Sequence, residues 1–233
     1  MRNIGRVFAI LMLTFSWSAC DRNEENPESE YEYFPLKLNS RYVYQLNETR
    51  YSAGNKEPKI TQWFEKDEVI REDVSLDGFP VFVFSRSRRN STIDSWQKVK
   101  EYTVTRYPEK YLLTIDDVTT MPMVFPIRNT ESWDINKYNT KGWEDCYYAY
   151  IGREDTVGEL SFGKTLKVQG RYSTDDDVVS YNNGYSKYAA GVGLVFDEQT
   201  DYEYCQESEA CLGKREIVSG LSTIRQLIEF EVP

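Results

Sequence analysis

Short runs of β-branched and aromatic residues, separated by turn residues, constrain the fold of this chain more than any other feature. Such runs predict strands, and no stretch after residue 20 carries a helical apolar stripe over three turns. Turn-forming residues lie at 53–55, 76–78 and 182–184. The expected strands cover 42–46, 60–64, 69–70, 81–84, 96–105, 111–115, 147–151, 160–168, 194–196 and 227–232.

Many short strands with hairpin-length gaps indicate a mostly β fold with a largely antiparallel sheet. We expect a curved sheet, half-barrel or sandwich with at most one or two short helices, one over 185–190 and ended by Gly191. No Pro/Gly linker, composition break or internal repeat interrupts residues 33–233. Since a β fold of about 200 residues can form one unit, the sequence predicts a single β domain over 33–233.

The first nineteen residues predict a secretory signal peptide, 1–19. Arg2 and Arg6 form a positive start, an apolar run covers 7–15, and Ser18 and Ala19 supply small residues for cleavage. The apolar run is about nine residues long, whereas a membrane-spanning helix needs about twenty.

The segment Trp17-Ser18-Ala19-Cys20 resembles the lipobox of bacterial lipoproteins. It departs from that pattern at Trp17, where the family usually carries an aliphatic residue. The resemblance implies that Cys20 is lipidated, palmitate included, and becomes the first residue of the mature protein. Several acyl chains give stable anchoring, so we expect the domain to be held at the cell envelope, in the outer membrane.

An acidic segment follows the cysteine, and residues 20–32 are expected to form a disordered tether because 21–30 hold no large apolar residue. The acidic run also resembles the export signal of Bacteroidota surface lipoproteins. A plain solvated linker explains it equally well. Both the periplasmic and the surface face of the membrane therefore stay open.

The formal charge opposes nucleic-acid binding. Without Arg2 and Arg6 the mature chain has 26 basic and 38 acidic residues, a charge of −12, whereas nucleic-acid binding needs a basic surface. The chain has no histidine, which excludes Ser-His-Asp and Cys-His nucleophile systems and zinc sites built on imidazole. We expect no enzyme, no catalytic residues, no metal and no cofactor.

Three cysteines remain after Cys20. Cys205 and Cys211 flank a polar loop and predict a hairpin closed by a disulfide. Cys146 lies in a strand-like segment and is expected to be a buried free thiol. Its pairing with either of the other two stays open, because connectivity cannot be read from sequence.

Other candidate sites have ordinary structural explanations beside the functional ones. The 18 tyrosines, 11 phenylalanines and 5 tryptophans suit a glycan or apolar-ligand platform, or simple sheet packing. Gly191 and Gly193 predict a tight turn rather than a phosphate loop. Acidic residues suggest calcium ligands or a solvated turn at 175–177, and a glycosidase pair or incidental neighbours at 116–117 and 144–145.

Two segments resemble uncharacterised Bacteroidota lipoproteins. One is the Phe-Pro-Leu run with the first strand, within 33–44, and the other is Tyr-Ala-Ala-Gly-Val-Gly-Leu-Val at 188–195. Where this chain has Asn39, that pattern often carries glycine. The resemblance implies a curved antiparallel sheet, loosely similar to the LolA-type lipoprotein carriers, and implies no activity.

The sequence thus predicts a membrane-anchored lipoprotein of the cell envelope that acts as a non-enzymatic binding or structural module. Its ligand, whether glycan, lipid or protein, is not indicated. Two alternatives remain: a carrier with an apolar cavity for lipids or lipoproteins, and a carboxylate-based glycan hydrolase. The carrier requires an apolar concave face, and the hydrolase requires two facing acids, one with a raised pKa.

Overall fold

The computed structural model describes residues 31–55, 57–174 and 176–233. The expected signal peptide, Cys20 and the tether up to residue 30 lie outside them, as does Asp175. The described chain forms one short 3-10 helix, η1 (Tyr31–Tyr33), and twelve strands. The strands are β1 (Arg41–Tyr51), β2 (Lys59–Val74), β3 (Pro80–Arg89), β4 (Gln97–Arg106), β5 (Lys110–Ile115), β6 (Val118–Val124), β7 (Ser132–Asp134), β8 (Asp145–Val157), β9 (Leu160–Tyr172), β10 (Ser180–Ala189), β11 (Gly193–Tyr204) and β12 (Ile217–Glu231).

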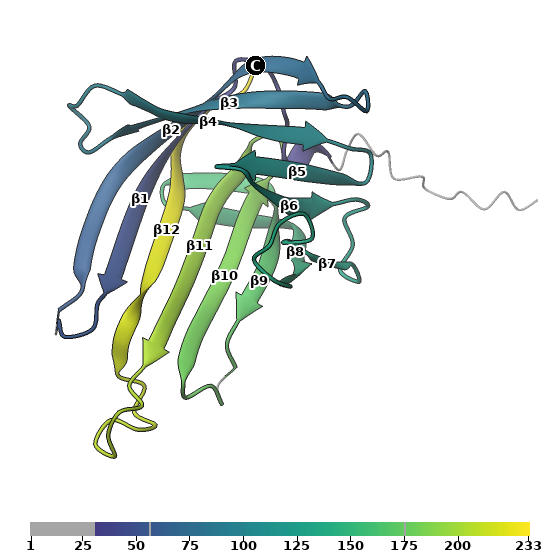
Figure 1. Ribbon diagram of the computed structural model, residues 1–233. Helices are drawn as coiled ribbons and strands as arrows, with labels where there is room; N and C mark the ends of the chain where they lie inside the picture. The colour runs from purple at the N-terminus through teal and green to yellow at the C-terminus, as the bar shows by residue number, and fades with distance from the viewer. Residues whose placement is uncertain (1–30, 56, 175) are drawn as a thin grey trace, which may run out of the picture.

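All twelve strands belong to one antiparallel sheet, which confirms the predicted fold class. Their order is β6-β5-β4-β3-β2-β1-β12-β11-β10-β9-β8-β7. The first and last strands pair in the middle of this sheet, from Arg41 opposite Glu231 to Tyr51 opposite Gly220. The sheet curls so strongly that β5 and β6 lie in front of β10 and β11 (Figure 1).

Hydrogen bonds across the two edge strands nearly close the sheet into a barrel. The backbone N–H of Met121 in β6 donates to the carbonyl of Ile135, just after β7, at 2.9 Å. The indole of Trp133 in β7 donates to the Met121 carbonyl at 2.7 Å. In addition, the Tyr148 hydroxyl donates to the Val124 carbonyl at 2.6 Å. These contacts satisfy edge groups that would otherwise be free to pair with another chain.

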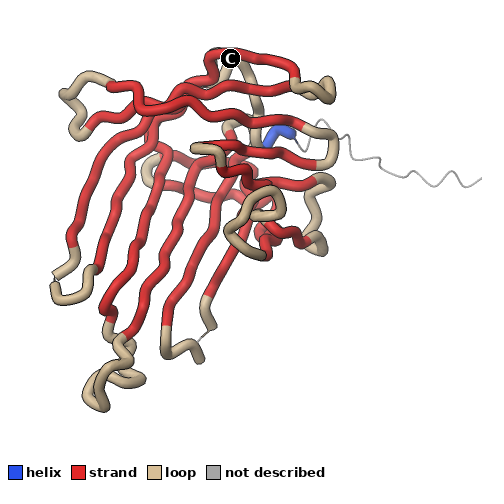
Figure 2. The backbone as a smooth tube through the Cα atoms, viewed as in Figure 1, coloured by secondary structure: helices blue, strands red, loops and turns tan. Residues whose placement is uncertain are grey.

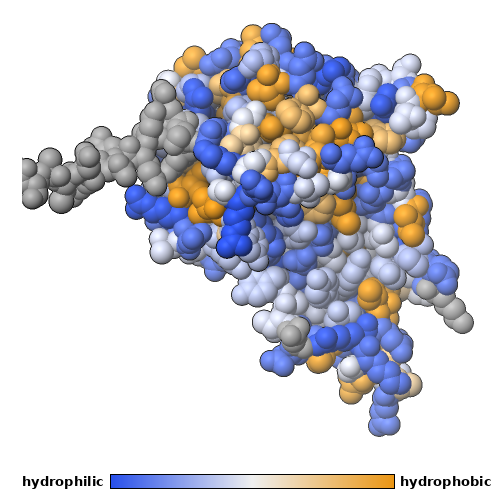
Figure 3. Space-filling model, turned by 180° about the vertical axis from the view of Figure 1, so that it is seen from behind, coloured by the Kyte–Doolittle hydropathy of each residue, from blue (hydrophilic) through white to orange (hydrophobic). Residues whose placement is uncertain are grey.

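The residues before β1 cover one end of the barrel. Phe34 packs its ring 5.7 Å from that of Tyr111 in β5 and 5.8 Å from that of Tyr188 in β10. Beyond the opposite end, β1, β2 and β9–β12 continue as an open extension of the sheet (Figure 2). Seen from behind, hydrophobic residues gather over the barrel, and the extension is mainly polar (Figure 3).

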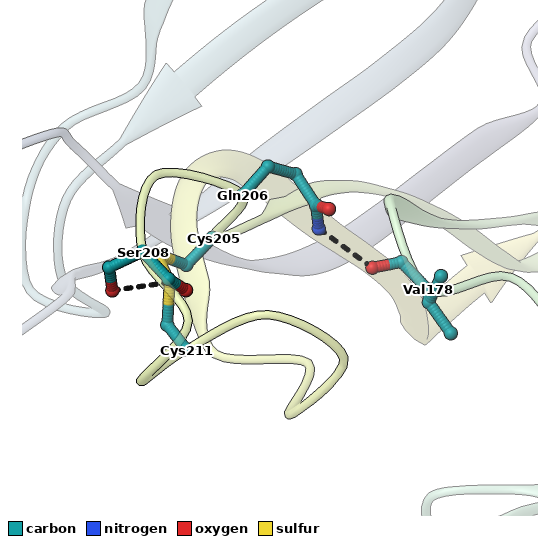
Figure 4. Close-up of a disulfide and its surroundings, with 5 residues drawn as sticks. All are labelled: Val178, Cys205, Gln206, Ser208 and Cys211. Atoms are coloured by element: carbon teal, nitrogen blue, oxygen red, sulfur yellow. Dashed lines mark hydrogen bonds between the residues drawn. A yellow bond between two sulfur atoms is a disulfide. The ribbon is translucent and has the colours of Figure 1, made fainter.

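The β11–β12 loop lies at the far end of this extension and contains a disulfide between Cys205 and Cys211 (Figure 4). The Gln206 side-chain amide donates to the Val178 carbonyl at 2.9 Å, which ties this loop to the neighbouring one. Cys146 in β8 is a buried free thiol. Burial and nearby carboxylates raise its pKa to about 12, so the thiol is poorly reactive.

Part of the β8–β9 hairpin folds back onto the outer face of the sheet and forms what we call the flap, residues 150–163. In Figure 1 it crosses behind β10, β11 and β12. The Lys187 ammonium in β10 lies 2.6 Å from the Asp155 carboxylate of the flap. The flap ring of Phe162 lies 6.3 Å from that of Phe230 in β12. The flap therefore adds a second layer over three strands.

One region differs from the sequence prediction. The helix expected over 185–190 is wrong, because these residues belong to β10 and its turn into β11. The turn expected at 182–184 is wrong too, since these residues are also in β10. Both neighbours, β9 and β11, pair with this strand, and such pairing overrides local propensity. Within the described residues, no helix is long and apolar enough to span a membrane.

Candidate functional site

One pocket lies where the flap leaves the sheet, and we call it the flap pocket. Its volume is about 380 Å³, within the range of about 300–1,000 Å³ typical of small-molecule sites. It lies between flap residues and the outward-facing side chains of β9 and β10. The residues that define its chemistry are Tyr150, Arg153, Asp155, Lys167, Tyr185 and Lys187.

A sharp bend in β8 creates this pocket. Between Ala149 and Arg153 the register of β8 against β9 shifts, so that β8 carries extra residues. Gly152 within the bend has a φ of 72°, and Tyr150 has a φ of 55°. A bulky residue with positive φ is uncommon, and strained residues of this kind cluster at functional sites. The Tyr150 side chain is left 58 % exposed at the rim.

Three cations and two carboxylates, those of Glu154 and Asp155, line the flap pocket, so its formal charge is positive. Lys187 is paired with Asp155 at 2.6 Å, but the described residues hold no ion pair for Arg153 or Lys167. Each of those two cations instead lies over a tyrosine ring, Arg153 at 5.2 Å from Tyr150 and Lys167 at 3.9 Å from Tyr185. Burial, with a smaller contribution from Lys187, lowers the pKa of Lys167. Two cations in this acidic protein are thus free to meet an anion.

Tyr185 forms one wall of the pocket and is held firmly in place. Its ring stacks on Phe196 of β11 with centroids 5.5 Å apart. Burial and the carboxylate of Glu198, to which its hydroxyl is hydrogen-bonded, raise its pKa. Glu198 in turn accepts a hydrogen bond of 3.0 Å from the amide of Asn183. A ring fixed in this way holds the Lys167 ammonium above it in a defined position.

A second group of charged residues lies inside the barrel, and we call Glu65, Asp67, Arg86 and Arg225 the ionic cluster. Asp67 accepts two hydrogen bonds from Arg86, at 2.8 and 2.9 Å, and one from Arg225. The Tyr102 hydroxyl also donates to Asp67, at 2.9 Å. Glu65 lies 3.5 Å from the Arg86 guanidinium. The cavity beside this cluster is only about 60 Å³ and enclosed, so we assign the cluster a structural role.

The carboxylates singled out in the sequence are not brought together by any described hydrogen bond or ion pair. Asp116 and Asp117 form the turn between β5 and β6, both with positive φ, and Asp116 pairs with Lys100. Asp145 begins β8 and accepts a hydrogen bond of 2.9 Å from Trp143. Among the described residues there is no group of three or more potential metal ligands, and Asp175 lies outside them. Gly191 lies in the tight β10–β11 turn predicted there, and Gly193 is the first residue of β11; both have a positive φ.

Sequence reasoning did not find the residues of the flap pocket. The two lysines and Tyr185 alternate with core residues in their strands, a pattern shared with every half-buried strand. The only local signal was Gly152 directly after Tyr150-Ile151 inside a strand-like run, since an isolated glycine in a strand suggests a bulge.

The chain is similar in structure to two solved proteins. One, from Bacteroides fragilis, is provisionally described as an exported protein with a YmcC-like fold. It is 12 % identical, with a TM-score of 0.42, over 85 % of this chain and 98 % of that one. The other, provisionally described as a lipoprotein from Parabacteroides distasonis, is 11 % identical, with a TM-score of 0.41 over the same shares. No protein-family model and no curated protein matches the sequence.

Proposed function

We propose that this chain is a lipid-anchored, non-enzymatic binding protein of the cell envelope, held in the outer membrane through Cys20, with the flap pocket as its ligand site. The observation that carries the proposal is the pair Arg153 and Lys167. Both lie over tyrosine rings in an open pocket, and neither is paired with a described carboxylate. Two cations that line one open pocket without a described carboxylate partner favour an anionic ligand.

The ligand class that fits best is a sugar ring bearing a carboxylate. Tyr150, which is 58 % exposed, offers an aromatic surface for the ring, and the two cations offer charged hydrogen bonds to a carboxylate. The Asp155 carboxylate, although paired with Lys187 at 2.6 Å, can accept a hydrogen bond from a sugar hydroxyl. The pocket volume of about 380 Å³ suits one or two such units.

The carrier alternative has less support. It requires an apolar cavity of several hundred cubic ångströms, whereas the enclosed cavity of the barrel is about 60 Å³ and lies beside Asp67, Arg86 and Arg225.

The hydrolase alternative requires an acid with a raised pKa, and Asp197 is such an acid. Burial raises the pKa of Asp197, against hydrogen bonds from Ser186 and Gln199. The adjacent carboxylate, Glu198, points to the opposite face of β11. Among the described residues, no second carboxylate faces Asp197 through a shared hydrogen-bond or ion-pair partner. The pair of facing acids that this chemistry needs therefore has no support.

Replacing Lys167 with glutamine is expected to weaken binding of glucuronate about 10-fold or more, because the variant loses a charged hydrogen bond. Lys164→Gln is the matched control. Lys164 lies on the same strand but does not line the flap pocket, and its 66 % exposed side chain forms only a long ion pair, of 3.8 Å, with Glu32. Isothermal titration calorimetry with glucuronate and glucose measures both variants. If wild type binds neither sugar, or if Lys164→Gln loses as much affinity as Lys167→Gln, the ligand assignment is wrong.

Cys20→Ala is expected to move the protein from the membrane fraction to the soluble fraction of lysed cells. Each buried methylene of an acyl chain contributes about 0.8 kcal/mol to membrane affinity, and this variant cannot be acylated. Protease treatment of intact cells then separates the two faces: a clipped wild-type domain faces outward, and a protected one faces the periplasm. Retention of Cys20→Ala in washed membranes would contradict the lipid anchor.

A further inference from the structure

A second pocket lies at the end of the barrel covered by the residues before β1, and we call it the tether-end pocket. Its volume is about 450 Å³. Lys37, Arg106 and Tyr111 line it together with residues of η1. Figure 1 shows η1, the first described element, beside the end of β5. None of the residues that line the flap pocket lines this one.

Arg106 and Tyr111 form the inner wall of this pocket. They are direct partners in the β4–β5 ladder, so their side chains lie on the same face of the sheet. The Arg106 guanidinium lies 5.8 Å from the ring of Tyr31 and 5.5 Å from that of Phe82. Across the residues that the structure describes, no carboxylate forms an ion pair with Arg106. The guanidinium donors therefore remain available.

The hydroxyl of Tyr111 is a buried donor without a partner. The side chain is 0 % exposed, and its ring lies among those of Tyr31, Phe34 and Phe125 at 6.0, 5.7 and 5.0 Å. No described group is hydrogen-bonded to its oxygen. Burial raises its pKa, with Arg106 opposing the shift, so the hydroxyl keeps its proton and can donate. A buried hydroxyl with no partner is rare and costly, which indicates that something else satisfies it.

We propose that the tether-end pocket binds a phosphate group, held by the Arg106 guanidinium and the Tyr111 hydroxyl, with the Lys37 ammonium at the rim. The planar guanidinium donates to two phosphate oxygens at once, and the hydroxyl reaches a third. Lys37 donates one hydrogen bond, of 2.8 Å, to the Pro233 carbonyl, which leaves two of its three donors free. The one carboxylate at the pocket, that of Glu32, lies 3.8 Å from the ammonium of Lys164.

A phosphate group can come from a lipid headgroup or from a soluble phosphate ester. Ten residues, 21–30, lie between Cys20 and Tyr31, and a fully extended chain spans at most about 40 Å from one to the other. If Cys20 carries the proposed anchor, this pocket stays close to the headgroups. The closeness of the pocket to the headgroups rests on the proposed lipid anchor, whereas phosphate binding itself does not.

The test uses the full chain carrying Cys20→Ala, so that no lipid anchor contributes. Inorganic phosphate and glycerol 3-phosphate are expected to raise its melting temperature at constant ionic strength, and calorimetry gives the affinity. Arg106→Gln and Tyr111→Phe are each expected to weaken binding about 10-fold or more. The control Arg71→Gln removes an arginine that pairs with Asp73 on β2 and is expected to leave the affinity unchanged.

Tyr111→Phe separates binding from folding. It keeps the packed ring and deletes only a hydroxyl without a described partner, so without ligand its melting temperature is expected to equal or exceed that of the Tyr111 parent. A variant that is as stable as its parent and binds phosphate more weakly supports the site. Equal phosphate affinity in Tyr111→Phe and its parent, or no response of the parent to either probe, would overturn the proposal.

Vesicle sedimentation of the same unlipidated chain identifies the source of the phosphate. Vesicles of phosphatidylethanolamine are compared with vesicles of a neutral glycolipid that lacks phosphate. Binding to the first alone, competed by glycerol 3-phosphate and lost in Arg106→Gln, supports a lipid headgroup. Binding of the soluble probes without vesicle binding supports a soluble phosphate ester. Equal binding to both vesicle types, undisturbed by glycerol 3-phosphate and Arg106→Gln, counts against the site.

Discussion

Replacing Asp67 with asparagine is expected to lower the free energy of unfolding by about 3–5 kcal/mol, because the change leaves buried cations without their counter-charge. The Asp67 side chain is 4 % exposed, and those of Arg86 and Arg225 are 14 % and 13 % exposed. Glu65 lies 3.5 and 3.8 Å from these two cations and compensates only in part. Urea unfolding of wild type and variant measures the difference.

Asp73→Asn is the matched control, since Asp73 lies on the same strand and pairs with Arg71 at 2.7 Å with both side chains exposed. Exposed ion pairs contribute little because water screens them, so this variant is expected to unfold at nearly the wild-type urea concentration. Equal effects of the two substitutions would show that the ionic cluster is not buried as described.

The same carboxylate makes stability depend on pH. Burial alone would raise the pKa of Asp67, but Arg225 and Arg86, with hydrogen bonds from Arg86 and Tyr102, outweigh it and lower the pKa to about 2. The value in an unfolded chain is about 3.9. The stabilisation is therefore complete above about pH 4 and is lost as the pH falls towards 2, a change of roughly 2–3 kcal/mol. In Asp67→Asn, the free energy of unfolding is expected not to show this additional fall between pH 4 and 2.

The fold class could be predicted because the aromatic and β-branched runs coincide with core strands, such as Phe82 and Phe84 in β3. The strands that were missed lack such runs. β7 is three residues long, and β6 contains Pro122, which an edge strand tolerates. In β10, Asn182, Asn183 and Gly184 have the composition of a turn, yet all three pair with β11, and Asn183 also pairs with β9, which makes them a strand.

The candidate sites could not be predicted, because they depend on register and on a bend. Asp67 and Arg225 are 158 residues apart and meet only because β1 pairs with both β2 and β12, so that side chains of these two strands reach each other across β1 on the inner face. Arg106 and Tyr111 are close in sequence, but their shared face follows from the β4–β5 register. The flap pocket exists only because β8 bends at Tyr150 and Gly152, and sequence patterns do not give the direction of a bend.

The pairing of β12 with its two neighbours rests on Gly220. This residue has a φ of 132° and lies opposite both Tyr51 of β1 and Tyr202 of β11. A Cβ atom added here would lie 2.2 Å from the backbone oxygen of Asp201 and 2.7 Å from the Cα of Tyr202. Because both are backbone atoms, they cannot move aside as a flexible side chain would.

Gly220→Ala is therefore expected to destabilise the protein by about 2–4 kcal/mol, from backbone strain and overpacking together. Gly213→Ala is the matched control: its φ of 73° is also positive, but an added Cβ would have no atom within 4 Å. The difference between the two variants then reports the close contact at Gly220 together with the added backbone strain of a φ of 132° over one of 73°. Hydrogen exchange shows where the damage lies, and the amides of β11 and β12 near Gly220 are expected to lose protection first. If Gly220→Ala is no less stable than Gly213→Ala, β11 and β12 cannot approach as closely as described, and their register must differ.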